Sequence, residues 1–209
     1  MVQAALWQVW RLAPLEGHLA RSACSAAYGV VHSSFVTNQP PEPARLIVMR
    51  HGKAEPFAAT DHERTLTARG VRDARDAGAH LRERGLVPDW VLVSSAVRAR
   101  QTWDAVCEGL GTSPEAFFED AVFTGSADVV LSCLAEAPAD ATTVMFVGHN
   151  PAASYVCHEL DDGQGDPVAV SGLLQGFPPA AVCVLEVAVP WDELGAETGR
   201  VLDYHVGGS

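Results

Sequence analysis

Three short runs of apolar residues alternate with longer segments of helical periodicity from residue 45 onward. The runs cover residues 46–49, 91–93 and 144–147, and they are typical of strands that are buried on both faces of a sheet. Each run is followed by a polar turn and then by an amphipathic segment. This alternation predicts an α/β fold, a three-layer α/β/α sandwich built on a mainly parallel sheet.

Boundary signals place four helices between and after these strands. Polar capping residues should start the helices, and glycines should end the first two. Two late apolar runs, at residues 182–189 and 201–206, complete the sheet, and residues 172–179 are expected to form the loop before the first of them. In chain order, the predicted helices run from Thr67 to Gly85, from Ser95 to Gly111, from Ser126 onward, and from Asn150 and Pro151 to Leu160.

Residues 1–44 do not share this alternation. They are rich in Ala and Ser and end in a proline cluster, so we expect a poorly ordered N-terminal extension, followed by one domain at residues 45–209. A targeting segment is an alternative, although a charged start, an apolar core and a cleavage site are missing. Because no stretch reaches the roughly 18 apolar residues of a membrane span, we expect a cytoplasmic protein without membrane contact.

The chain of 209 residues carries a net charge of −12, and this charge is unevenly distributed. Residues 45–100 hold eleven Lys or Arg against seven Asp or Glu, whereas residues 101–209 hold only Arg200 against seventeen acids. An acidic chain repels nucleic acid, and the arginines of the first predicted helix alternate with acids as on a salt-bridged surface. An anionic substrate must therefore be bound by residues 45–100.

The five cysteines are scattered without CxxC spacing, and none is followed five residues later by an arginine, as the usual cysteine phosphatase loop requires. P-loop, GxSxG and HExxH patterns are also absent. The sequence therefore argues against several common enzyme classes.

The polar residues directly after the three strands carry the strongest functional signal. In open α/β sheets the reactive crevice lies beyond the carboxyl ends of the strands. Arg50 and His51 follow the first strand, Arg98 follows the second, and His149 follows the third. The sequence thus predicts that two imidazoles and at least two guanidinium groups meet at one edge of the sheet.

This set of side chains suits phosphoryl transfer to an imidazole without a metal ion or other cofactor. A neutral histidine can attack phosphorus in line, while planar arginines hold the nonbridging oxygens. Gly52 would let a phosphate approach the backbone, and Lys53 could contact the phosphate or face solvent. Ser95, as a helix cap, would place Arg98 in the first turn, where the helix dipole favours an anion.

At these residues the sequence resembles the histidine phosphatase superfamily, also called phosphoglycerate mutase-like. The Arg-His-Gly signature of the family stands at residues 50–52, and its distant Gly-His motif stands at residues 148–149. A Leu-Thr-x-x-Gly pattern at residues 66–70 and a Val-Ser-x-x-x-Arg-Ala-x-Gln-Thr pattern at residues 93–102 are similar to those of bacterial phosphohistidine phosphatases of the SixA type. The resemblance covers residues 45–209.

The resemblance implies a role for each matching residue. His51 would be the nucleophile that becomes phosphorylated, Arg50 and Arg98 would clamp the phosphate, and His149 would stabilise the transferred group. Gly52 and Lys53 would line the substrate site, while Arg100 should face solvent. Two kinds of residue stay open: His62 could contact the substrate, and the general acid of larger relatives has four candidates, namely Glu55, Asp61, Glu63 and Asp120.

The implied activity is a metal-independent phosphatase that hydrolyses phosphohistidine or a small phosphomonoester. A phosphoramidate needs less help from an acid, so the missing acid motif favours phosphohistidine. A mutase, a nucleotide or sugar phosphatase, and a noncatalytic phosphate-binding module are the alternatives. The partner would be a phosphorylated small molecule or a phosphohistidine protein, and the sequence gives no oligomeric state.

Overall fold

A computed structural model of the protein describes residues 43–208. The expectations for residues 1–42, including poor order, lie outside the described part. Within residues 43–208, no helix combines the length and the apolar composition that crossing a membrane requires.

A six-stranded sheet forms the centre of the domain, with the strand order β3-β2-β4-β1-β5-β6. The strands that supply the site, β1 (Ala44–Arg50), β2 (Trp90–Ser94) and β4 (Thr143–Gly148), are parallel neighbours. β3 (Ala116–Glu119) extends this parallel part at one edge. β5 (Ala181–Val187) and β6 (Gly199–Val206) are antiparallel at the other, so the sheet is mixed.

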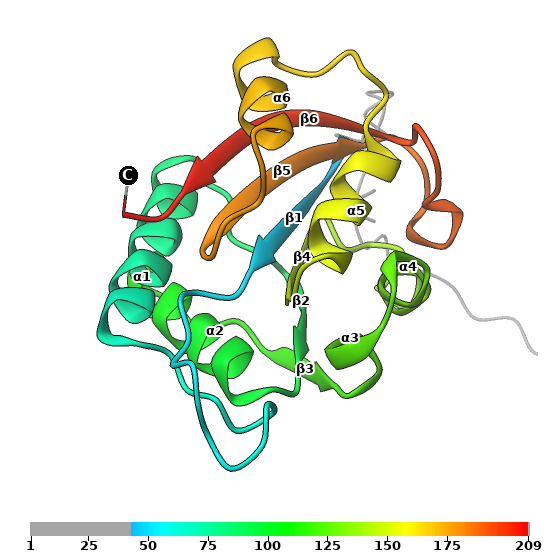
Figure 1. The fold of residues 1–209 in the computed structure, drawn as a ribbon. Helices are drawn as coiled ribbons and strands as arrows, with labels where there is room; N and C mark the ends of the chain where they lie inside the picture. The colour runs from blue at the N-terminus through cyan, green and yellow to red at the C-terminus, as the bar shows by residue number, and fades with distance from the viewer. Residues whose placement is uncertain (1–42, 209) are drawn as a thin grey trace, which may run out of the picture. The chain divides into compact units, whose positions relative to one another are not determined.

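Helices cover both faces of the sheet, which confirms the predicted three layers (Figure 1). α1 (Ala68–Glu83) and α2 (Val97–Leu110) pack on one face, where Ile47 and Met49 of β1 are buried. The alternate residues Leu46 and Val48 are buried against the opposite layer. That layer contains the helices α4 (Ala127–Leu134), α5 (Ala152–Leu160) and α6 (Pro167–Leu174).

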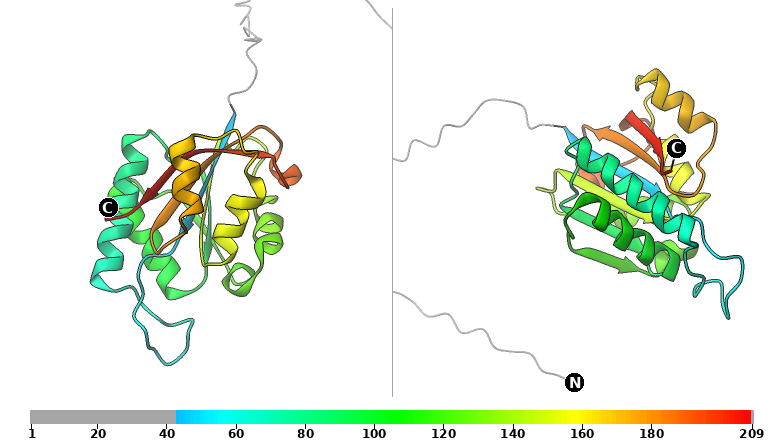
Figure 2. Two further views of the ribbon diagram at one scale, coloured as in Figure 1. Left: turned by 45° about the horizontal axis from the view of Figure 1, so that its top comes forward. Right: turned by 90° about the vertical axis from the view of Figure 1, so that its left-hand side faces the viewer.

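The two helices on the first face pack with their backbones in contact (Figure 2). A Cβ atom on Gly78 of α1 would clash with the Val106 carbonyl oxygen of α2. A Cβ atom on Gly109 of α2 would overlap the Arg75 carbonyl oxygen of α1 in the same way. Glycine at both positions therefore lets α1 and α2 approach more closely than side chains would permit.

The helix boundaries partly match the sequence. Thr67 caps α1, since its side chain accepts a hydrogen bond from the Gly70 N–H, and α2 ends at Gly111 in the left-handed conformation. The expected cap at Ser95 is wrong, because the N-cap of α2 is Ala96, without a side-chain bond. Asn150 likewise does not cap α5, since its side chain donates to the Phe177 carbonyl oxygen at 2.9 Å.

Several elements were not expected. The short helix α3 (Ala121–Thr124), the edge strand β3 and the 3-10 turn at Trp191–Glu193 have no clear sequence signal. The expected loop at residues 172–179 is wrong at its start, because α6 continues to Leu174. The salt-bridged surface predicted for α1 is confirmed within the helix by the ion pair of Arg69 with Asp73, while Arg75 pairs with Glu108 of α2 and the C-cap residue Arg84 pairs with Asp203 of β6.

Candidate active site

The carboxyl ends of β1, β4 and β2 bring the predicted residues together at one edge of the sheet. Arg50 is in register with Gly148, and Val93 is in register with Val147, so the residues that follow each strand start at the same level. The ring centroids of His51 and His149 are 5.0 Å apart. Arg98, in the first turn of α2, places its Nε atom 3.3 Å from His51 Nε2.

Hydrogen bonds around His51 fix which ring nitrogen carries the proton. Its Nδ1 atom lies 2.7 Å from the Gly52 carbonyl oxygen, which can only accept, so Nδ1 is the protonated nitrogen. In a neutral imidazole the other nitrogen, Nε2, then holds a free lone pair. The Arg98 Nε–H donates toward that lone pair. His51 is therefore oriented with an unprotonated nitrogen facing the arginine.

The surroundings keep His51 neutral. The pKa of His51 is lowered to about 4, mainly by burial and also by the charges of Arg98 and Arg50, while the hydrogen bond to Gly52 acts in the opposite direction. Burial and the nearby His51 and Arg98 lower the pKa of His149 to about 3. Both imidazoles are consequently uncharged at neutral pH.

Arg98 is almost completely buried, with only 5% of the residue exposed, and its guanidinium is held by the loop between β1 and α1. Its Nη1 atom donates to the Asp61 carbonyl oxygen at 2.6 Å, and its Nη2 atom donates to the Asp61 carboxylate at 2.9 Å. Hydrogen bonding from Arg64, with a further contribution from Arg98, lowers the pKa of Asp61. Asp61 is thus an anion that binds both Nη atoms of Arg98, through its carbonyl oxygen and its carboxylate.

His149 is held by a buried hydroxyl that sequence reasoning did not single out. Its Nε2 atom lies 2.8 Å from Ser94 Oγ, and Ser94 is fully buried at the end of β2. The other ring nitrogen of His149 is buried without a hydrogen-bond partner. Ser94 therefore fixes the orientation of His149 relative to β2.

Arg50 is tied to the loop after α6. Its Nη1 atom donates to the Phe177 carbonyl oxygen at 2.9 Å, an oxygen that also accepts from Asn150. Its Nε atom is buried without a hydrogen-bond partner among residues 43–208. A buried donor of this kind is costly unless a ligand or water satisfies it, so Arg50 retains binding capacity for an anion.

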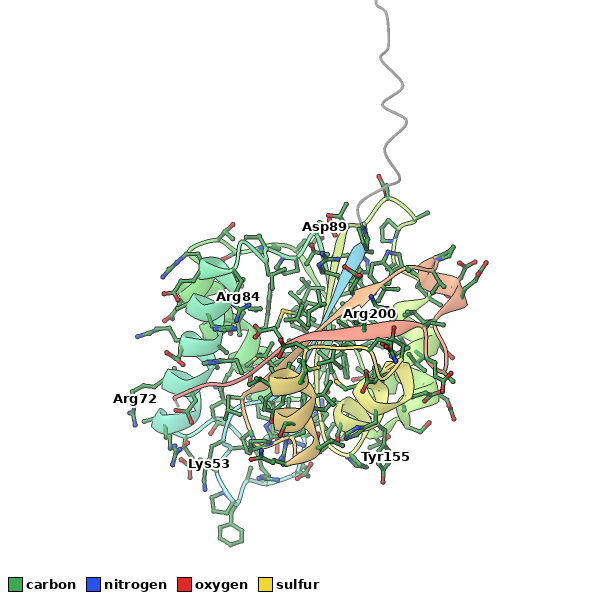
Figure 3. All side chains as sticks on the ribbon, turned by 90° about the horizontal axis from the view of Figure 1, so that it is seen from above. Lys53, Arg72, Arg84, Asp89, Tyr155 and Arg200 are labelled. Atoms are coloured by element: carbon green, nitrogen blue, oxygen red, sulfur yellow. The ribbon has the colours of Figure 1, made fainter. Side chains whose placement is uncertain are left out.

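Gly52 packs against the start of α1, and Lys53 faces solvent. A Cβ atom on Gly52 would lie 2.6 Å from the Gly70 carbonyl oxygen, so this glycine is required by the contact with the start of α1. Its N–H donates to Thr102 Oγ1 at 3.0 Å. Lys53 is exposed and lies at the outer edge of the molecule in Figure 3, without a side-chain bond among residues 43–208.

The remaining candidates divide clearly by their contacts. Asp61 alone among the four acids bonds to a site arginine, whereas Glu55, Glu63 and Asp120 are exposed and make no such bond within residues 43–208. Arg100 is exposed, as predicted, and lies over the Phe118 ring at 4.5 Å. No group of three or more His, Cys, Asp or Glu in the described chain is arranged to hold a metal ion.

One site residue was missed altogether. Phe123 of α3 has its ring centroid 5.5 Å from that of His149 and 5.1 Å from that of His62, both in edge contacts. The Arg98 guanidinium carbon lies 5.6 Å from the same ring. His62 is held in turn by Ser95 Oγ at 3.0 Å from its Nε2 atom. A lone aromatic residue in a short segment without periodicity gives no functional signal.

Comparison with known proteins identifies the family of this chain. Residues 46–119 match the model of the histidine phosphatase superfamily, branch 1. An uncharacterized protein of Mycobacterium tuberculosis is 32% identical over 160 residues, which cover 76% of this chain and 99% of that protein. Phosphohistidine phosphatase SixA of Escherichia coli K12 is 32% identical over 129 residues, which cover 59% of this chain and 78% of that protein.

Solved structures agree with the sequence comparisons. The structure of a Nakamurella multipartitia protein, provisionally assigned as phosphohistidine phosphatase SixA, has a TM-score of 0.71 and 33% sequence identity. The match covers 82% of this chain and all of that one. The fold is thus shared with this structure.

Proposed function

Since this chain belongs to the histidine phosphatase superfamily and is a phosphatase of SixA-like fold, we propose that it acts through a phosphohistidine intermediate on His51. The observation that carries this proposal is the unprotonated Nε2 atom of His51, 3.3 Å from Arg98 Nε. We propose phosphohistidine as the substrate class, with small phosphomonoesters as the alternative.

The first step forms a bond from the Nε2 lone pair of His51 to phosphorus and breaks the bond from phosphorus to the leaving atom. The leaving atom keeps the bonding electron pair and takes up a proton. Arg98 and Arg50 offset the charge of the nonbridging oxygens, and His149 stabilises the transferred group. The Asp61 carboxylate is bonded to Arg98 in the structure, so a phosphoryl group that binds Arg98 would displace this carboxylate.

The second step returns His51 to its starting state. A water oxygen bonds to phosphorus, the bond from phosphorus to Nε2 breaks, and phosphate is released with the protons of the water shared between product and solvent. The proton on His51 Nδ1 stays in place throughout both steps, because it is hydrogen-bonded to the Gly52 carbonyl oxygen. The buried imidazole therefore starts and ends each cycle in the same protonation state.

The surroundings of Asp61 support a phosphoramidate substrate. Its lowered pKa makes Asp61 a poor proton donor, and the side chains of the other three acids are exposed and make no hydrogen bond to a site residue within residues 43–208. A phosphoramidate nitrogen is readily protonated before it leaves, whereas an alcohol leaving group depends on an acid in the transition state. An enzyme without a well-placed acid therefore favours the former class.

The test combines labelling with turnover. We expect the wild type to hydrolyse a phosphohistidine peptide in the presence of chelator, to be inhibited by vanadate, and to acquire an acid-labile phosphate label. His51→Ala should lose both turnover and label, whereas Arg100→Ala, which changes an exposed arginine of the same helix as Arg98, should retain most activity. Labelling of His51→Ala would refute the proposed nucleophile, and loss of wild-type activity with chelator would indicate a metallohydrolase.

The substrate class needs a separate comparison. We expect kcat/KM for phosphohistidine peptides to exceed that for nucleotides and sugar phosphates. A preference for either of the latter would leave the His51 mechanism intact and assign the enzyme to another substrate class of the superfamily. A protein that binds phosphate but turns over none of these compounds would be a noncatalytic module.

A further inference from the structure

We propose that Phe123 forms one wall of the subsite for the leaving group and selects substrates whose leaving group is a flat aromatic ring. This inference rests on the proposed function of the site, and it adds a specificity-determining residue that the signature motifs do not contain. Phe123 belongs to α3, which lies outside the three strand ends that carry the motifs.

The position of the ring is defined by three polar side chains from three different segments. His149 follows β4, Arg98 lies in α2, and His62 lies in the loop between β1 and α1. Both imidazoles meet the Phe123 ring in an edge-to-face arrangement, with interplanar angles of 77° for His149 and 81° for His62. The residue is partly exposed, so part of the ring is free to contact a ligand.

The contacts place Phe123 beside His149 and Arg98, the two groups that would hold the phosphoryl oxygens. In-line attack requires the leaving atom to depart away from His51 Nε2. Within residues 43–208, the His51 ring lies tilted against the His149 ring, with an interplanar angle of 59°, and makes no ring contact with Phe123. Phe123 therefore contacts two groups that would hold the phosphoryl oxygens but not the attacking imidazole, as a wall of the leaving-group subsite would.

The chemistry of this wall favours a flat ring. Aromatic rings prefer offset or edge-to-face contacts with one another, and such a contact contributes beyond simple burial of area. The acidic side chains that could bind a hydroxylated leaving group make no bond to this wall: those of Glu55, Glu63 and Asp120 are exposed and have no hydrogen bond to a site residue within residues 43–208, and Asp120 meets Phe123 through its backbone carbonyl oxygen at 3.0 Å. An N-phosphorylated imidazole would fit this apolar wall better than a leaving group without a ring.

The experiment compares two phosphoramidates, one with a ring in its leaving group and one without, and follows how the ratio of their rates changes between wild type and variants. Phosphoimidazole carries an imidazole leaving group, and phosphoramidate itself carries ammonia. We expect Phe123→Ala to lower the ratio of kcat/KM for phosphoimidazole to kcat/KM for phosphoramidate roughly three- to tenfold, the range of one aromatic contact. Phe123→Leu, which keeps an apolar side chain in place, should lower the ratio similarly, and Phe123→Tyr should restore it.

A matched control comes from the neighbouring strand. Phe118 of β3 is also partly exposed but contacts Arg100 and no imidazole of the site among the described residues, so Phe118→Ala should leave the ratio unchanged. Equal losses on both substrates in Phe123→Ala and Phe123→Leu would overturn the inference and assign Phe123 a purely structural role. A wild type that turns over neither substrate would instead refute the proposed function.

Discussion

The low pKa of His51 makes the most direct prediction about the free enzyme. An unperturbed histidine titrates near 6.5, whereas burial beside Arg98 and Arg50 lowers the pKa of His51 to about 4. At pH 5.5 an imidazole with a pKa of 4 is about 97% neutral, and one with a pKa of 6.5 is about 9% neutral. The structure therefore predicts that the neutral fraction of His51 at pH 5.5 is about ten times larger than that of an exposed histidine.

The titration can be measured without turnover. We expect the Cε1 resonance of His51, followed by NMR in specifically labelled protein, to titrate with a midpoint near 4 and to show the proton on Nδ1 at neutral pH. Direct observation is preferable to a rate profile alone, because phosphomonoester substrates ionise near pH 6 themselves. With phosphoramidate substrates, kcat/KM should show no loss that is attributable to His51 between pH 7 and 5.5.

Arg98→Gln tests the physical cause of the shift. Removal of a neighbouring positive charge favours the imidazolium form, so the pKa of His51 should rise. Burial is the largest cause and stays in place, so the pKa should remain below 6.5 in this variant. A wild-type midpoint near 6.5, or a fall of the pKa in Arg98→Gln, would refute the assignment of a desolvated, neutral His51.

Three further predictions concern the contacts around the site. Asp61→Asn removes the anion that occupies Arg98, so inorganic phosphate should inhibit the variant several-fold more strongly in a competition assay; weaker inhibition would show that Asp61 mainly orients the arginine. Ser94→Ala removes the hydroxyl that holds His149, so it should raise the activation free energy by about 1–2 kcal/mol and lower kcat/KM accordingly, with Ser94→Thr closer to the wild type. Equal activity of the wild type and both variants would contradict this role. Gly70→Ala introduces a Cβ atom into the Lys53 backbone and should lower the free energy of unfolding in urea by about 1–3 kcal/mol, whereas Gly195→Ala, in open space, should change it little.

The sequence predicted the parts of the fold that bury alternate residues on two faces. The runs around Leu46, Val91 and Val144 are fully buried strands, and the polar residues after them meet as expected. β3 could not be predicted, because its adjacent residues Phe117 and Phe118 are both about half exposed at the edge of the sheet and show no alternation.

Details of the site depended on contacts between segments that are distant in sequence. Ser95 was expected to cap α2, but its hydroxyl is bonded to His62, which lies 33 residues away. Gly52 was expected to admit a phosphate, yet the nearest atoms to its missing Cβ belong to Gly70. Local patterns identify which residue types are present, whereas the partner that each residue contacts is set by the packing of loops and helices.

The close packing of α1 and α2 has a consequence for how this enzyme can change. Gly70, at the start of α1, supports the backbone beside His51, and Arg98 extends from the start of α2. The relative positions of His51 and Arg98 therefore depend on how closely α1 and α2 pack at Gly78 and Gly109. Substitution of these two glycines would move α1 and α2 apart and change the activity without altering any polar residue. Homologues that retain every motif yet replace both glycines should therefore be assayed separately.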